Sequence, residues 1–397
     1  MTFRHCVASG GWLSATTTIT GRRHLVTEEY PDAVLRQHQQ DRSTEIVEYI
    51  NSHWDDNVSR QDPTVVRLTD GLRRGLRSSL AEAITLVESR NPTKKAQGEY
   101  ILAELLRLAK KRIDKYGPGS LIFRVAFTGP PGVGKSTFIE TFGKFLIDEH
   151  KKKVAVLTID PSSVTTGGSI MGDVARMQEL SRDDNAFVRA SATHGTLGGL
   201  TKGTHEAVIL CEGAGYNIVL VETVGVGQSE AAAASVVDMM VLLLSPAQGD
   251  ELQGIKRGLM ELADLIIVTK ADGDLEKQAR LTQTEYISAL KYMRRRFRAW
   301  VPKVLRASSL SKEGLPEIYE NMMAFRNAIA DSGELLNQRH KQMTEWMWEH
   351  VDNVLMDLFR RHPEIVKKVP VLSEDIRNGR LTPGLAAEIM LREFLKV

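Results

Sequence analysis

The chain has 397 residues, of which 42% are hydrophobic, and a formal net charge of +2. This length allows two or three structural units, and the nearly balanced charge gives no reason to expect nucleic acid or an acidic membrane as the main partner. The only cysteines are Cys6 and Cys211, which excludes a disulfide framework and a cysteine-rich metal site. No stretch approaches eighteen consecutive apolar residues, so a transmembrane helix is not expected.

The first stretch, residues 1–27, is rich in Ser and Thr and contains arginines but no Asp or Glu. This composition is typical of a mitochondrial transit peptide, and its apolar run is too short and broken for a secretory signal. We therefore expect a mitochondrial matrix protein, with a disordered cytosolic tail as the alternative. Residues 28–69 are polar, and we expect a linker there.

Helical periodicity begins after the linker. Apolar residues recur at helical spacing through residues 70–118, interrupted at Asn91-Pro92. We expect a helical pair that packs ahead of the next domain. The glycines Gly117 and Gly119 then mark the join to a first strand.

From residue 119 to residue 331, short apolar runs alternate with amphipathic segments. The predicted strands are Leu121–Phe127, Val154–Ile159, Ile218–Val221, Met239–Leu244, Leu265–Thr269 and Val304–Leu305. This alternation predicts an α/β fold with a mostly parallel sheet flanked by helices. Ligands of such sheets bind beyond the carboxyl ends of the strands, and the motifs described below each follow a strand.

The first of these motifs matches the spacing G-x-x-x-x-G-K-[ST], and we call it the phosphate loop. In this pattern backbone N–H groups surround a polyphosphate, the lysine meets its outer phosphates, and the hydroxyl binds magnesium. A glycine-rich turn without a ligand is the alternative, but the lysine and hydroxyl would then have no packing role. The residues of the loop are Gly129, Pro130, Pro131, Gly132, Val133, Gly134, Lys135, Ser136 and Thr137.

Two acids follow predicted strands and are the candidates for magnesium and water chemistry. Asp160 ends one strand and could reach the metal or orient an attacking water, or could simply cap the turn before Pro161. Glu222 ends another, before a segment whose glycines could leave the backbone free to approach phosphate or could merely make a tight turn. Asp173 lies in a further glycine-containing loop, which could order around a γ-phosphate. We interpret Lys135, Asp160 and Glu222 as the catalytic set.

The segment Val268–Asp272 resembles the guanine motif N-K-x-D, with Thr269 in place of the usual asparagine. Lys270 and Asp272 are its other two defining residues. An aspartate accepts hydrogen bonds from the N1 and N2 donors of guanine, whereas adenine presents an acceptor at N1. Ser308, Ser309 and Leu310 are the expected last base-side loop. An ordinary strand-end turn is the alternative.

Two polar segments leave their roles open. The loop around Asp250, Gln253 and Lys256 could couple nucleotide state to a partner or could be a solvated helix start. The run Arg294–Arg296, with Arg298, is interpreted as a solvated end of a helix, where the macrodipole favours cations.

The tail, residues 332–397, is again helical, with a break at His362-Pro363. Trp346 and Trp348 lie on an apolar stripe that could belong either to the core or to a subunit interface, where Trp is enriched.

Taken together, the motifs resemble the MeaB family of SIMIBI-class P-loop GTPases, over roughly Leu80 to Phe394. The resemblance includes residues 81–89, 195–199, 249–256 and 383–387 besides the motifs above. It implies a chaperone that binds and hydrolyses GTP and gates adenosylcobalamin loading of methylmalonyl-CoA mutase, which it also protects or reactivates. It further implies a homodimer held by the C-terminal helical arm, which favours an interface role for the tryptophans.

The resemblance also implies roles for single residues. Ser136, Asp160, Asp173 and Glu222 would form a Mg²⁺ shell, and Asp272 would read guanine in GTP or GDP. The loop with Asp250, Gln253 and Lys256 would be a third switch facing the partner. Residues 172–176 and 189–194 depart from the family pattern near the first switch.

Residue Pro130 stands where related dimeric ATPases insert an extra lysine across their interface. Since a charged finger can be worth about 10³ to 10⁵ in rate, we expect slow intrinsic hydrolysis that a partner stimulates. The alternatives are a kinase that uses ATP, a nickel metallochaperone GTPase, for which the dispersed histidines give no cluster, and a scaffold that does not hydrolyse its nucleotide.

Overall fold

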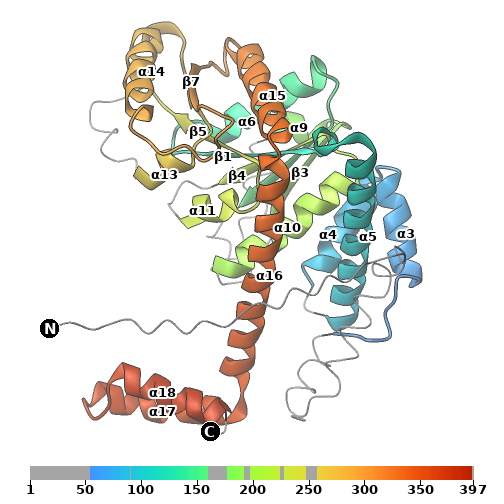
Figure 1. The fold of residues 1–397 in the computed structure, drawn as a ribbon, viewed down its shortest axis with the longest axis vertical. Coiled ribbons are helices and arrows are strands. Elements are labelled where there is room, and N and C mark those ends of the chain that lie inside the picture. Colours follow the sequence, from blue (N-terminus) through green and yellow to red (C-terminus); the bar gives the residue numbers. More distant parts are fainter. Residues whose placement is uncertain are drawn as a thin grey trace, which may run out of the picture. The chain divides into compact units, whose positions relative to one another are not determined.

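A computed structural model of the protein describes residues 54–89, 91–159, 177–191, 197–223, 228–246 and 257–395. Within this part the fold is α/β, as predicted, and its sheet has seven strands in the order β3-β2-β4-β1-β5-β6-β7 (Figure 1). Every neighbouring pair is parallel. The strands are β1 (Phe123–Thr128), β2 (Val154–Ile159), β3 (Ala186–Ser191), β4 (Ile218–Thr223), β5 (Met239–Leu244), β6 (Leu265–Val268) and β7 (Lys303–Arg306).

The central strands are buried on both faces, as their continuous apolar sequences require. In β1, Val125 and Phe127 pack into one core cluster and Ala126 into the other, because successive side chains point to opposite faces. In β4, Leu220 and Val221 divide in the same way. Helices must therefore cover both sides of the sheet.

The helices form two layers. One layer packs on the face of Ala126 and comprises α3 (Pro63–Arg73), α4 (Arg77–Val87), α5 (Pro92–Tyr116), α10 (Leu197–Gly213), α11 (Gln228–Ala234), α13 (Arg257–Leu262) and α14 (Glu276–Leu290). The other packs on the face of Phe127 and comprises α6 (Lys135–Asp148), α9 (Gln178–Arg182), α15 (Leu315–Asp331) and the start of α16 (Glu334–Arg361). The last helices are α17 (Pro363–Arg377) and α18 (Pro383–Leu395), which pack on each other.

Helix α3 begins inside the segment that the sequence predicts to be a linker. The carboxylate of Asp62 accepts hydrogen bonds from the backbone N–H groups of Thr64 and Val65, at 2.8 and 3.3 Å. This is an N-cap, and Pro63 fits the first helical position because it has no N–H to satisfy. In the sequence, the pair Asp62-Pro63 was the signal for this helix start. With α3 added, the predicted helical pair is a group of three helices, α3, α4 and α5.

Strand β3 was not among the predicted strands. Among the described strands it lies at the edge of the sheet and pairs with β2 alone. Its side chain Arg189 forms an ion pair with Glu88 of the helical layer, with 2.6 Å between Nη2 and Oε2. A polar residue on an edge strand breaks the apolar run on which strand prediction depends.

The two tryptophans of α16 have different surroundings. The Trp346 ring stacks on His205 of α10, with 3.6 Å between ring centroids, and its indole N–H donates to the Ser235 carbonyl at 2.9 Å. The Trp348 side chain is 59% exposed. Of the two alternatives, packing against the body therefore applies to Trp346, whereas Trp348 is exposed.

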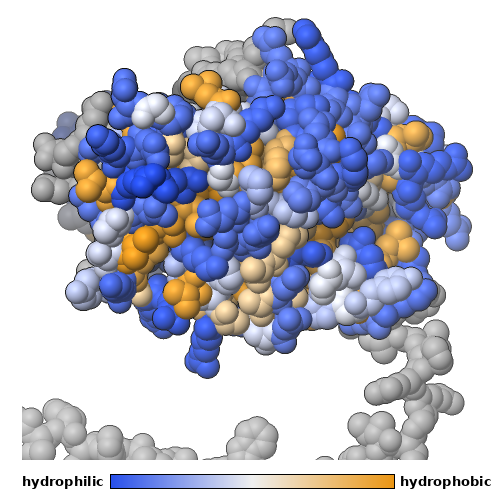
Figure 2. Space-filling model, turned by 90° about the horizontal axis from the view of Figure 1, so that it is seen from above, coloured by the Kyte–Doolittle hydropathy of each residue, from blue (hydrophilic) through white to orange (hydrophobic). Residues whose placement is uncertain are grey.

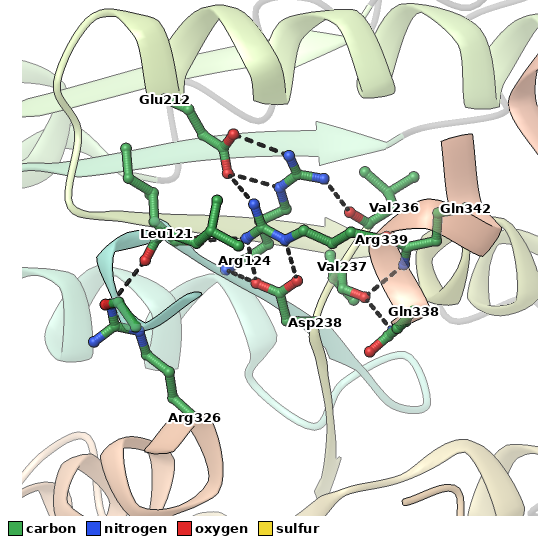
Figure 3. A network of polar contacts seen from close by, with 12 residues as sticks. Leu121, Arg124, Glu212, Val236, Val237, Asp238, Arg326, Gln338, Arg339 and Gln342 are labelled. Atoms are coloured by element: carbon green, nitrogen blue, oxygen red, sulfur yellow. Dashed lines mark hydrogen bonds and ion pairs between the residues drawn. The ribbon is translucent and has the colours of Figure 1, made fainter. Parts of the chain in front are cut away.

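A buried cluster of four charged side chains fastens α16 to the sheet (Figure 3). Arg124 of β1 forms a bidentate pair with Glu212, at 2.8 and 2.9 Å. Arg339 of α16 donates to Glu212 and to both carboxylate oxygens of Asp238, the latter at 2.8 and 2.7 Å. All four side chains are less than 10% exposed, and the cluster has no net charge.

The arginines of this cluster act on the pKa of Glu212. Burial alone would raise the pKa of Glu212, but the charges of Arg124 and Arg339 outweigh it and hold that pKa below its ordinary value. Beside the cluster, Gln338 and Gln342 both donate to the Val237 carbonyl, at 2.9 Å each. The start of α16 is therefore part of the folded core.

The outer surface of the described residues is mostly hydrophilic in the view from above, where hydrophobic residues form small, separate groups (Figure 2). Large exposed apolar side chains recur instead along the sequence of the last three helices. They include Met343, Met347, Trp348, Val351, Leu355, Met356, Val366, Val369, Val371, Leu385, Leu391 and Leu395. None of the described helices is both long enough and apolar enough to cross a membrane.

Replacing Arg339 should destabilise the protein strongly. In Arg339→Met, Glu212 and Asp238 stay buried with a single arginine between them, so the free energy of unfolding should fall by about 3–5 kcal/mol. The matched control is Lys341→Met on the same helix, whose pair with Glu345 is exposed and should be worth about 0–1 kcal/mol. Urea unfolding followed by circular dichroism measures both, and equal midpoints would contradict the role of the cluster.

Candidate nucleotide site

The phosphate loop lies between β1 and α6, at the carboxyl end of the central strand. Gly132 and Gly134 have φ values of 83° and 92°, which side chains rarely adopt. Gly129 approaches the neighbouring strand so closely that a Cβ atom there would lie 2.3 Å from the carbonyl oxygen of Leu243. Glycine is therefore required by the turn and by the packing of the loop on β5.

Lys135 is the first residue of α6 and is 9% exposed. Its ammonium group donates to the carbonyls of Gly129 and Pro130, at 2.9 and 3.1 Å, and so closes the loop on itself. Burial lowers the pKa of Lys135, while the nearby charges of Glu222 and Glu230 act in the opposite direction. The lysine is held at the loop, where a bound polyphosphate would be a stronger partner than two carbonyls.

Ser136 and Glu222 are brought together from distant parts of the sequence. The Ser136 hydroxyl donates to Oε1 of Glu222 at 2.6 Å. This contact follows from the sheet order, because β4 is next to β1 and Phe127 is paired in register with Glu222. A hydroxyl and a carboxylate are hard oxygen ligands, so the pair suits Mg²⁺.

The segment after β6 is tied to the phosphate loop. The Thr269 hydroxyl, which is buried, lies 2.9 Å from the Val133 carbonyl and 3.0 Å from the Leu244 carbonyl, both within hydrogen-bonding distance. Lys270 adopts a positive φ of 54° and donates to the Gly132 carbonyl at 2.9 Å. Thr269 departs from the motif's usual asparagine, and its hydroxyl contacts the phosphate loop directly at Val133.

Asp272 is held from behind by the segment that follows β7. The Ser308 hydroxyl donates to Oδ2 of Asp272 and accepts from the backbone N–H groups of Leu310 and Ser311, at 3.1 and 3.0 Å. Ser308 is fully buried, Ser309 is half-buried and Leu310 is 85% exposed. Ser308 therefore positions the aspartate, while Leu310 is free to contact a ligand.

The remaining predicted residues divide into two groups. Pro131 and Thr137 are exposed at the loop, Pro130 is half-buried, and Val133 is buried beneath it. The other predicted residues lie outside the described part of the chain: Asp160, Asp173, Asp250, Gln253 and Lys256.

One residue near the loop was missed by the sequence analysis. Glu230 of α11 is 2% exposed, and its charge acts on Lys135. Among the described residues its Oε2 atom has no hydrogen-bond partner. In the sequence, the available signal for Glu230 was its position two residues beyond Gln228, just after the glycine-containing segment that follows Glu222.

No group of three or more His, Cys, Asp or Glu side chains among the described residues could hold a metal ion. Of the four predicted magnesium ligands, only Ser136 and Glu222 fall in this part. The two are in contact and carry only oxygen donors, so the described half of the shell fits magnesium.

The strand, glycine loop and helix, with an acid delivered by the neighbouring strand, define a P-loop nucleotide-binding protein. Residues 80–364 match the family described as "Methylmalonyl Co-A mutase-associated GTPase MeaB". The chain belongs to this family of GTPases, as its motifs indicated.

Relatives match most of the chain. A protein named methylmalonic aciduria type A homolog, mitochondrial, from Caenorhabditis elegans is 55% identical over 88% of this chain and 88% of its own length. The mouse protein of the same name is 49% identical over 87% and 83%. GTPase ArgK of Escherichia coli is 40% identical over 82% and 95%.

A solved structure resembles the chain closely as well. The crystal structure of LAO/AO transport system kinase has a TM-score of 0.65, is 34% identical, and is matched over 86% of this chain and 100% of its own.

The close approach of Gly129 to β5 gives a direct test of the loop. Gly129→Ala should destabilise the protein more than Gly132→Ala, because its Cβ would meet a backbone oxygen, whereas Gly132 has open space around it. In Gly132→Ala only the positive φ is unfavourable, and it should lower the free energy of unfolding by about 1–2 kcal/mol. Thermal unfolding of both variants, with GDP binding as a second measure, checks this ranking; a reversed order would refute the packing argument.

Proposed function

We propose that this protein is a GTP-hydrolysing chaperone of methylmalonyl-CoA mutase, which gates loading of adenosylcobalamin and protects or reactivates the mutase. The observation that carries the proposal is the family match over residues 80–364, together with a phosphate loop that retains every motif residue. The names of the relatives, which refer to methylmalonic aciduria and to mitochondria, also support it.

In the proposed mechanism, Lys135 leaves the carbonyls of Gly129 and Pro130 to bind the outer phosphates of GTP. A magnesium ion would neutralise phosphate charge, held by Ser136 and Glu222 together with Asp160 and Asp173. In the sequence Asp160 directly follows Ile159, which is paired in register with Thr223, the neighbour of Glu222. Asp160 and Glu222, with Lys135, form the proposed catalytic set.

Base selection is assigned to Asp272, with Lys270 and the segment Ser308–Leu310 around it. Ser308 donates to one carboxylate oxygen, which leaves the other to accept from guanine. The aspartate favours guanine over adenine and so argues against an ATP-dependent kinase, the activity that the name of the LAO/AO structure suggests for that protein.

The assembly and location follow from the ends of the chain. We propose a homodimer held by α16, α17 and α18, because their exposed apolar side chains form a surface that a second copy could cover. Residues 1–27 are proposed to be a transit peptide to the mitochondrial matrix and the residues from 28 to the start of α3 at Pro63 a linker. The N-terminal helical segment then extends to residue 118, the GTPase domain covers 119–331 and the dimerisation arm 332–397. The segment with Asp250, Gln253 and Lys256 is the proposed partner switch.

Hydrolysis should be slow in the isolated protein and faster with its partner. Single-turnover GTP hydrolysis is to be measured with and without methylmalonyl-CoA mutase. A charged group contributed by the partner would raise the rate by about 10³-fold or more. A mutase that has been heat-inactivated is the control. Equal, fast rates in both conditions would contradict a partner-stimulated switch.

Asp272→Asn should weaken GDP binding roughly 10- to 100-fold, because an amide donor would face the guanine donors. The same variant should gain affinity for xanthosine diphosphate, whose C2 carbonyl accepts that donor. Asp274→Asn, two residues away and exposed, is the matched control. Isothermal titration calorimetry measures the nucleotide affinities of the unmodified protein and of both variants. If the unmodified protein bound ATP more tightly than GTP, the kinase alternative would be favoured instead.

A further inference from the structure

A groove of about 530 Å³ opens at the free edge of the sheet, where β7 pairs with β6 and with no other described strand. We call it the β7 groove. It lies toward the amino-terminal end of β7, whereas Asp272 and Ser308 follow the carboxyl ends of β6 and β7. Because the strands are parallel, the groove is remote from the phosphate loop. Its apolar lining is formed by Met260, Ala263, Ile287, Leu290, Met293, Val301, Pro302, Val304 and Leu305.

Basic side chains surround this apolar lining. Lys291, Arg294, Arg295 and Lys303 all line the groove, against one acid, Glu317. Lys303 is engaged, since its ammonium group donates to Oδ1 of Asn321 at 2.6 Å. In the described part of the chain, the other three cations form no side-chain hydrogen bond or ion pair.

The arginine run divides between the core and this groove. Arg296 turns inward and pairs with the buried carboxylate of Asp264, with 2.8 Å between Nη1 and Oδ2. Arg294 and Arg295 are exposed at the groove. The run lies beyond the last residue of α14, Leu290, and the guanidinium groups of Arg294 and Arg295 have no ion-pair partner among the described residues.

The groove combines unpaired cations with an apolar floor. Ile287 and Val301 are 43% and 53% exposed, so part of the floor is open to solvent. A free anion would need no apolar floor. A nucleic acid or an anionic membrane would favour an extended basic surface, and here Glu317 and a net charge of +2 oppose it. The complementary ligand is a short segment with apolar side chains flanked by acids.

We propose that the β7 groove docks an acidic amphipathic segment of a partner protein. Apolar side chains of the segment enter the groove, and its flanking Asp or Glu residues pair with Lys291, Arg294 and Arg295. Recognition proceeds through side chains rather than by strand addition, because the Gln283 amide already donates to the Val304 carbonyl on the edge strand, at 2.8 Å. The proposal goes beyond the nucleotide switch and does not depend on it.

The test uses the full chain and a fluorescein-labelled peptide probe, EDLLEDLLE, followed by fluorescence anisotropy. Binding to the unmodified protein should be measurable below about 1 mM and should weaken roughly tenfold or more in the double variant Arg294→Glu with Arg295→Glu. The matched control, Arg73→Glu with Arg74→Glu, also reverses two adjacent exposed arginines and should bind the probe as the unmodified protein does.

Two further arms separate the apolar and charged contributions. Ile287→Ser and the serine peptide EDSSEDSSE should each weaken binding, and the basic peptide KKLLKKLLK should bind the charge-reversed protein better than the unmodified one. GDP affinity should stay unchanged in every groove variant, which confirms that each is folded.

Several outcomes would overturn the proposal. These are the absence of probe binding, an equal loss in both charge-reversed variants, or a serine peptide that binds as well as the leucine peptide. Binding of phosphatidylserine vesicles or of a single-stranded RNA through Arg294 and Arg295, without binding of the peptide, would also overturn it and assign the groove to that ligand.

Discussion

The buried cluster of Arg124, Glu212, Asp238 and Arg339 is the constraint on which the arrangement of this protein depends. It joins β1, α10, the residue before β5 and α16 at the amino-terminal end of the central strands. Isolated charges could not occupy this position, because each would lose its hydration without compensation. Four charges of balanced sign, with a backbone carbonyl as a further acceptor, satisfy one another and allow a polar helix to close a hydrophobic core.

The two ends of the sheet consequently have different tasks. The amino-terminal end carries the ion cluster and is tied to α16. The carboxyl end carries the phosphate loop, Glu222 and the base-side segments, because parallel strands deliver all their following loops to one edge. Since β1 lies between β4 and β5, the acid of one neighbour meets Ser136, and the backbone of the other limits Gly129 to a residue without a side chain.

Local patterns in the sequence were sufficient to predict the phosphate loop, the α/β class and most of the strands. A phosphate loop is determined by residues within one turn, and strands that are buried on both faces appear as continuous apolar runs. Prediction failed where contacts between residues far apart in the sequence determine the structure. Strand β3 is interrupted by Arg189, which pairs with Glu88, 101 positions earlier in the sequence. Trp346 is packed because its ring stacks on His205 of another helix.

The same argument applies to Thr269 and Glu230. In the sequence, Thr269 is only a departure from a motif, and Glu230 is an ordinary helical residue. Only the fold shows that the threonine joins the base-side segment to the Val133 carbonyl and that the glutamate is buried where its charge reaches Lys135. Roles that depend on a partner far away in the sequence cannot be assigned from local spacing.

The connections of α11 link the nucleotide end of the sheet to the C-terminal helices. This helix follows β4 and contributes Glu230 beside Lys135, and just beyond its last turn the carbonyls of Ser235 and Val237 accept hydrogen bonds from Trp346, Gln338 and Gln342 of α16. A displacement of α11 would break these bonds unless α16 moved with it. Because α16 is also anchored through Arg339, it has one attachment to the ion cluster and a second to the residues that follow α11. The helix that places Glu230 near Lys135 is therefore followed directly by the carbonyls that α16 binds.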